Sequence, residues 1–194
     1  MNKLTILLIL LTPSLMLSLG GCFNFGDNGT TIAPDEGYTI YKTDDFNISV
    51  PEKWEVIGQN EFTSDVPNVT VVVFRNNVKN ETFTANVNIV SKKIQDPVNS
   101  LEYAKMVINR ESSGLVGYNE LSKESITITT GETDTETLLN RFEAKKTVND
   151  NTVRYIQTYG VKGDTGFIVT GAVSPRESES VLQTVEKIVK SFRL

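Results

Sequence analysis

The chain of 194 residues contains no histidine and only one cysteine. Without histidine it cannot form a Ser-His-Asp triad, a Cys-His pair or the common histidine-containing zinc sites. It also lacks the side chain best suited to proton transfer near neutral pH. The sequence shows no Walker A motif, no G-x-G-x-x-G after a strand and no G-x-S-x-G. Among function classes, an enzyme is therefore the least favoured, and no motif specifies a reaction or a ligand.

Long apolar runs are also absent, except at the start of the chain. Residues 4–19 are almost wholly apolar, follow the positive charge of Lys3, and are interrupted by Pro13. The run is shorter than the roughly 18–20 residues that a spanning helix needs. A basic tip, a short apolar region and small residues after it are typical of a secretory signal peptide. We expect this signal peptide over residues 1–21.

The only cysteine lies directly after that segment. Leu19, Gly20, Gly21 and Cys22 resemble the lipobox of prokaryotic lipoproteins, which has an aliphatic residue, two small residues and then cysteine. The resemblance implies cleavage before Cys22 and a thioether-linked diacylglycerol on its sulfur. The alternative is an ordinary cleaved signal with a coincidental cysteine. Two acyl chains anchor a protein stably, so we expect a membrane-bound protein on the extracytoplasmic face, or on the periplasmic side of an envelope membrane.

Charge and composition constrain the rest of the chain. Without residues 1–21, 18 basic and 24 acidic side chains remain, a net charge of −6. This acidic balance argues against nucleic acid as a partner, because nucleic acid needs a basic surface. Residues 22–37 are rich in Gly, Asn, Asp and Thr and are predicted to form a flexible linker after the lipidated cysteine. Residues 38–194 have the length of one domain.

Hydrophobic periodicity predicts an α+β domain with an antiparallel sheet of about six to seven strands flanked by helices. A first helix is predicted after Asn99, which has capping-box spacing to Glu102. A last helix is predicted to begin with Ser174 as its cap and Pro175 in its first turn. The predicted strands lie near residues 39–41, 46–50, 68–74, 82–90, 118–130, 136–148, 152–162 and 166–173.

Three features of the domain resemble a known superfamily. They are Phe46, Pro51 and Trp54 in an aromatic-x-apolar-x-apolar-Pro-x-x-Trp segment, a mid-chain helix before a meander, and a closing helix that ends at Phe192. Together they resemble the PsbP-like superfamily of PsbP, Mog and DcrB-type proteins. The resemblance implies an αβα sandwich and a binding or assembly role rather than catalysis, and it transfers no particular partner. Metal binding in photosynthetic members uses histidine in part, and this chain has none.

One acidic run is a candidate cation site. On a strand, Glu132, Asp134 and Glu136 would share one face, and clustered carboxylates suit Ca²⁺. The alternative is a solvated face that discourages pairing of sheet edges. The basic side chains Arg141, Lys145, Lys146 and Arg154 are expected on a solvated surface.

Four asparagines begin N-x-Ser/Thr sequons. Asn47 and Asn68 fall in or beside predicted strands, so Asn28 and Asn80 are the better candidates for glycosylation. The sequence as a whole predicts a lipid-anchored, non-catalytic binding or assembly module for a membrane-associated complex, with a protein partner. The alternative is a lipoprotein that binds a small ligand or a metal and is associated with transport. Apart from the lipid, no cofactor is expected.

Overall fold

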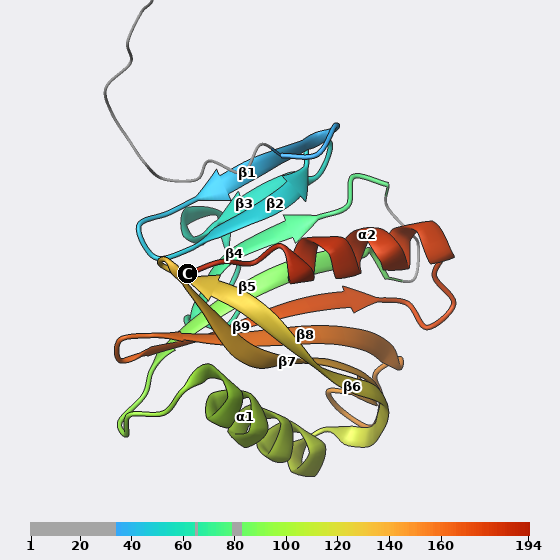
Figure 1. The fold of residues 1–194 in the computed structure, drawn as a ribbon. Helices are drawn as coiled ribbons and strands as arrows, with labels where there is room; N and C mark the ends of the chain where they lie inside the picture. The colour runs from blue at the N-terminus through green and yellow to red at the C-terminus, as the bar shows by residue number, and fades with distance from the viewer. Residues whose placement is uncertain (1–33, 65, 79–82) are drawn as a thin grey trace, which may run out of the picture. The chain divides into compact units, whose positions relative to one another are not determined.

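The computed structural model describes residues 34–194 except residue 65 and residues 79–82. Within this part, a seven-stranded antiparallel sheet has the strand order β3-β4-β5-β9-β8-β7-β6 (Figure 1). Its strands are β3 (Glu55–Gly58), β4 (Thr70–Arg75), β5 (Asn86–Lys93), β6 (Val116–Thr130), β7 (Thr133–Lys145), β8 (Val153–Lys162) and β9 (Thr165–Val173). The predicted α+β fold and its sheet are confirmed.

The strand pairs of this sheet are partly local and partly long-range. β6, β7, β8 and β9 pair in chain order as an antiparallel meander, and β4 pairs with β5 as a hairpin, as the sequence predicts. The link between the two groups is the pairing of β5 with β9, in which Asn86 faces Ala172 and Lys93 faces Thr165. This long-range pair joins strands β3 to β5 and strands β6 to β9 into one sheet.

A second, two-stranded sheet consists of β1 (Tyr38–Lys42) and β2 (Asn47–Pro51). The alternating pattern predicts both strands but does not show that they pair with each other alone. Ile48 and Val50 of β2 point into the protein and are fully buried. The small sheet therefore serves as a cover for the main sheet.

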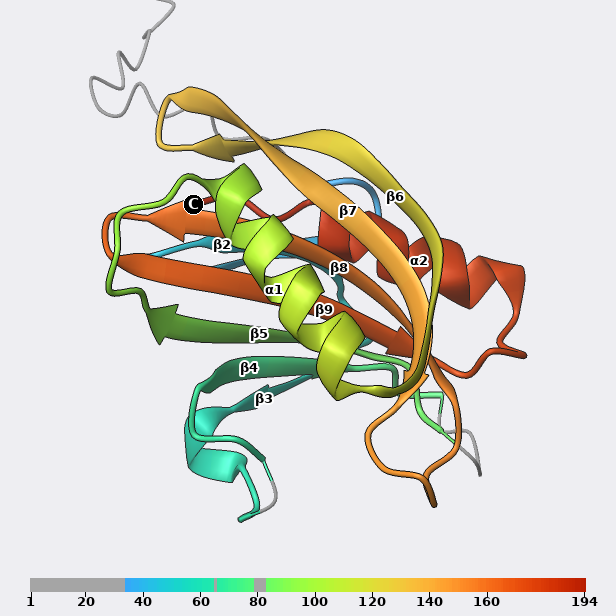
Figure 2. The same ribbon diagram turned by 90° about the horizontal axis from the view of Figure 1, so that it is seen from below.

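Two helices complete a three-layer arrangement. α1 (Ser100–Gly114) packs on β7 and β8, whereas α2 (Glu179–Lys190) packs on β8 and β9. Figures 1 and 2 show that the helices lie on opposite faces of the main sheet, with β1 and β2 on the side of α2. In the described ranges, no helix is long and apolar enough to cross a membrane.

The start of α1 is as predicted, but that of α2 is not. The Asn99 side chain accepts from the Glu102 backbone N–H at 2.9 Å, and the Glu102 carboxylate accepts from the Asn99 N–H at 3.2 Å. The predicted cap at Ser174 is wrong, because residues 174–177 form a turn in which the Glu177 N–H donates to the Ser174 carbonyl at 3.0 Å. Ser178 stands at the N-cap instead, without a side-chain capping bond.

Each face of the sheet has its own core. Beneath α2 and the small sheet lies the larger one, which includes Phe46, Phe74, Phe167, Val185 and Phe192. The smaller core beneath α1 consists of Tyr103, Ala104, Val107, Ile108, Leu138, Tyr159 and Ile168. Trp54 is partly buried and packs against the larger core.

The residues after α2 join distant strands. Arg193 exchanges two backbone hydrogen bonds with Asn47 of β2, at 2.9 and 3.0 Å. The Leu194 N–H donates to the Thr129 carbonyl at 2.9 Å, and the Gly131 N–H donates to the Leu194 carbonyl at 2.7 Å. This short tail therefore ties the small sheet to the β6–β7 hairpin.

Candidate functional site

Three of the residues predicted as modification sites lie outside the described residues. They are Cys22, Asn28 and Asn80, so lipidation and glycosylation stay predictions. Asn47 is part of β2 and its backbone pairs with Arg193. Asn68 is exposed in the turn before β4.

The three carboxylates of the predicted cation site lie along the β6–β7 hairpin. Glu132 is in the turn, whereas Asp134 and Glu136 are in β7. Asp134 accepts from the Thr129 hydroxyl at 3.3 Å, and Glu136 accepts from the Ser125 hydroxyl at 2.6 Å. Among the described residues, no group of three Asp, Glu, Cys or His side chains is placed to hold a metal ion. The hairpin thus gives the calcium site no support, and the site stays a prediction.

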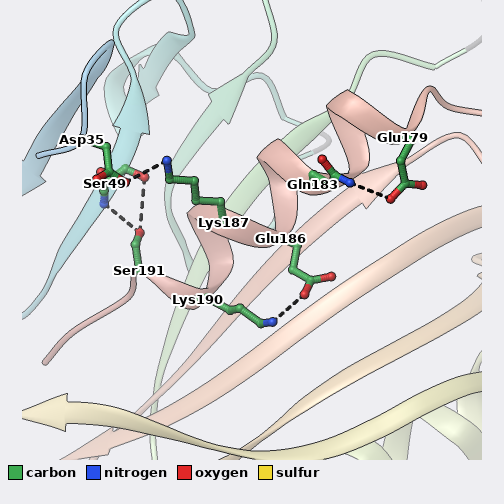
Figure 3. A pocket seen from close by; sticks show the side chains of 8 residues that line it. All are labelled: Asp35, Ser49, Glu179, Gln183, Glu186, Lys187, Lys190 and Ser191. Atoms are coloured by element: carbon green, nitrogen blue, oxygen red, sulfur yellow. Dashed lines mark hydrogen bonds and ion pairs between the residues drawn. The ribbon is translucent and has the colours of Figure 1, made fainter.

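An open groove of about 560 Å³ runs along α2. We call it the α2 groove. Figure 3 shows that polar side chains line it, from the helix, from β2 and from the segment before β1. The lining residues are Asp35, Ser49, Glu179, Gln183, Glu186, Lys187, Lys190 and Ser191.

Both lysines of the α2 groove pair with acidic side chains, whereas Glu179 accepts a hydrogen bond from Gln183 at 3.1 Å. Lys187 forms an ion pair of 2.8 Å with Asp35 and lies 4.2 Å from the centre of the Tyr38 ring. The Lys190 ammonium contacts Glu186 at 2.6 Å. These contacts arrange charges of both signs along the groove, with Asp35 at the point where the described chain begins.

Arg141 of β7 connects the main sheet to Glu186 in the α2 groove. Its guanidinium donates to both carboxylate oxygens of Glu186, at 2.7 and 3.0 Å, and to Glu124 at 2.9 Å. The hydrogen bond from Arg141 is the main reason why the pKa of Glu186 lies below its ordinary value, and burial opposes it. The expected solvated position of Arg141 is wrong, since its side chain is only 21% exposed.

A second polar cluster is buried on the other face of the sheet, beside the end of α1. Gln157 of β8 donates to Glu111 of α1 at 3.3 Å and to the Thr170 hydroxyl of β9 at 3.1 Å. The Tyr159 hydroxyl donates to Gln157 at 2.8 Å, and Asn140 of β7 donates to the Tyr118 hydroxyl at 3.1 Å. This cluster holds the C-terminal half of α1, whereas apolar side chains hold its N-terminal half.

Glu111 is incompletely satisfied in this cluster. Its Oε2 atom is buried without a hydrogen-bond partner among the described residues, and so is the Oδ1 atom of Asn140. Burial raises the pKa of the Glu111 carboxyl, while the hydrogen bond from Gln157 and the charge of Arg110 oppose the rise. Burial without a partner for Oε2 makes the charged form of Glu111 more costly than it is in water.

The arrangement of these carboxyl groups bears on catalysis. Paired acid and base catalysis needs two groups with separated pKa values in one cleft. Glu111 and Glu186 have pKa values shifted in opposite directions, but they belong to helices on opposite faces of the sheet (Figures 1 and 2). They therefore cannot act on one substrate.

Sequence reasoning did not find these sites. The helical period places Glu186 and Lys190 one turn apart, so their pairing was accessible. The contact of Glu186 with Arg141 joins residues 45 positions apart, and that of Glu111 with Gln157 joins residues 46 positions apart. No local pattern signals such contacts.

Comparisons with known proteins identify the fold. No model of a known protein family matches the chain, and no curated protein matches its sequence. The structure is similar to the solution structure of cyanobacterial PsbP from Synechocystis, with 12% identity, a TM-score of 0.55, and coverage of 88% of this chain and 98% of that one. It is similar to the Saccharomyces cerevisiae Ran-binding protein Mog1p, with 13% identity, a TM-score of 0.54, and coverage of 80% and 94%.

A third similar structure is the protein PA94 of Pseudomonas aeruginosa, which is described as a putative regulator. It has 11% identity, a TM-score of 0.51, and coverage of 79% of this chain and 94% of that one. At such low identity the likenesses show the fold and no function. The resemblance to PsbP and Mog proteins that Phe46, Pro51, Trp54 and Phe192 suggest is thereby confirmed as a shared PsbP-like fold.

Proposed function

We propose that this protein is a lipid-anchored, extracytoplasmic and non-catalytic binding module that holds a protein partner in a membrane-associated complex. The observation that carries the proposal is the α2 groove, which is open and lined by polar and charged side chains. Small-molecule sites are mostly enclosed and apolar. Charges of both signs on an open surface instead suit the complementary surface of a protein.

The position of the groove fits a tethered protein. Asp35 belongs to the predicted linker and lines the groove through its ion pair with Lys187. If the linker predicted after Cys22 behaves as a coil, its root-mean-square span would be about 20 Å. The groove would then stay within reach of proteins at the membrane surface.

The fold is compatible with this role. One protein with the same fold, Mog1p, is a Ran-binding protein, so the scaffold can present a protein-binding surface.

The anchor is tested by Cys22→Ser. Fractionation of cells and mass spectrometry of the mature protein should show diacylglycerol on the wild type, and a released or unprocessed variant. Equal membrane retention and an unmodified mass for both proteins would contradict the anchor.

Partner binding is tested by crosslinking in intact cells with the lipidated protein, followed by mass spectrometry. We expect one dominant membrane-associated protein, which is lost or strongly reduced with Cys22→Ser. The absence of a reproducible partner would contradict the binding proposal.

A further inference from the structure

We infer that a second hollow, lined by Tyr38 and Trp54, binds a neutral saccharide. This hollow has a volume of about 390 Å³ and lies where the small sheet, the start of β3, the loop after β4 and α2 meet. We call it the Trp54 hollow. Its lining residues are Gly37, Tyr38, Pro51, Glu52, Lys53, Trp54, Asn77 and Thr184. The inference does not depend on the α2 groove.

The apolar part of the Trp54 hollow consists of flat rings. Tyr38 and Trp54 supply them, and Pro51, which faces Tyr38 in the register of β1 and β2, adds an apolar ring. One face of a sugar ring presents C–H groups that stack on aromatic rings. Tyr and Trp suit such contacts because they combine a broad apolar body with a polar tip.

The polar part of the Trp54 hollow consists of three exposed side chains. In the part of the chain that the structure describes, the side chains of Glu52, Lys53 and Asn77 form no hydrogen bond or ion pair with protein. They supply a carboxylate acceptor, an ammonium donor and an amide that can donate and accept. Sugar hydroxyls need donors and acceptors of this kind along the edge of the ring. The α2 groove differs, because its lysines Lys187 and Lys190 already pair with Asp35 and Glu186.

The backbone prepares this arrangement before a ligand binds. The Glu52 N–H donates to the Gly37 carbonyl at 3.0 Å, and the Trp54 N–H donates to the Pro51 carbonyl at 2.9 Å. Gly37 has a φ of 77°, a conformation that glycine adopts without strain, so the chain turns into β1 without a side chain at this point. A fixed backbone reduces the entropy that binding would cost.

Charge distinguishes a saccharide from other ligands of aromatic sites. Aromatic pairs also bind organic cations, but Lys187, 4.2 Å from the centre of the Tyr38 ring, and Lys53 place two positive charges at this hollow that repel a cation. Glu52 opposes a ligand with a high negative charge. The volume lies near the lower end of the roughly 300–1,000 Å³ found for small-molecule sites, which suits a short, neutral saccharide.

Trp54 provides the test, because it is the only tryptophan in the chain. The full-length protein is titrated with maltotriose, cellotriose and chitotriose at millimolar concentration, while Trp54 fluorescence and its quenching by acrylamide are recorded. We expect at least one of these sugars to change the fluorescence saturably and to protect Trp54 from acrylamide. Tetramethylammonium is titrated in parallel.

Two exposed variants connect the signal to the hollow. Asn77→Ala and Glu52→Ala should each weaken the binding of that sugar by about fivefold, the effect of one lost hydrogen bond. Asn109→Ala on the exposed side of α1 is the matched control and should bind as the wild type does. No fluorescence change with any of the three sugars would overturn the inference. A fluorescence change with tetramethylammonium alone would also overturn it, and so would a sugar-induced change that neither variant weakens. None of these results bears on the partner crosslinking of the proposed function.

Discussion

Arg141 of β7 and Glu186 of α2 form a two-pronged ion pair, in which Nε and Nη2 of Arg141 lie 3.0 and 2.7 Å from the two carboxylate oxygens. Their side chains are only 21% and 25% exposed. The pair holds α2 to the main sheet through a polar contact beside an apolar core. It also fixes Glu186, which lines the α2 groove.

We predict that Arg141→Ala lowers the free energy of unfolding by about 1–2 kcal/mol, between the values for exposed and buried pairs. The loss arises because the half-buried Glu186 would lose its two-pronged partner. Urea unfolding of the variant and the wild type measures this loss of free energy. The control is Arg75→Ala, which removes a pair with Glu55 whose side chains are 39% and 49% exposed and should cost less than about 1 kcal/mol. Equal losses for the two variants would contradict the role given to Arg141.

Glu111 gives a prediction about pH. Because burial raises its pKa in the folded protein, the folded state holds the proton more tightly than the unfolded state does. The resulting contribution to stability is complete below the unfolded pKa, near 4.5, and is lost as pH rises through the raised value. We therefore expect the stability of the wild type to fall with pH, relative to that of Glu111→Gln, across this window.

Urea unfolding of the wild type and Glu111→Gln at a series of pH values checks this expectation. Other titrating groups cancel in the difference between the two proteins. If the free energies of unfolding of the two proteins changed with pH in parallel, the pKa of Glu111 would not be raised by folding, which would contradict the prediction. Hydrogen exchange of the last turns of α1 should show the same pH dependence, because Gln157 holds Glu111 there.

Gly171 of β9 lies directly against Val185 and Val189 of α2. A Cβ atom at this position would overlap Val185 Cγ1, so Gly171→Ala should push α2 outward and cost about 1–3 kcal/mol in unfolding free energy. Gly114→Ala is the control, because no atom lies within 4 Å of its added Cβ and alanine favours a helix by up to about 1 kcal/mol. An unchanged free energy of unfolding for Gly171→Ala would mean that α2 is not packed against β9 as described.

Local chemistry explains which parts of the fold the sequence predicts. The cap of α1 at Asn99 is correct because its two hydrogen bonds span only three residues. The meander of β6 to β9 is correct because its strands pair with their chain neighbours. The cap of α2 is misplaced because Ser174 and Ser178 both offer a capping hydroxyl, and the turn at Ser174 uses the first.

Long-range contacts explain the rest. The pairing of β5 with β9 and the separate β1–β2 sheet depend on which surfaces meet after the chain collapses. The α2 groove likewise brings together Asp35, Ser49 and Lys187 from distant parts of the chain. Arg141 and Glu111 look like ordinary surface residues in the sequence, because nothing local shows that each is covered by another element.

Photo-crosslinking from inside the α2 groove tests the central proposal most directly. A photoreactive residue replaces Gln183 in the groove or, as a matched control, exposed Lys105 on α1, and intact cells carrying the lipidated protein are irradiated. We predict that Gln183 captures one dominant membrane-associated protein and that Lys105 does not. Capture of the same protein with equal yield from both positions, or of none from Gln183, would contradict the proposal that the α2 groove is the binding surface.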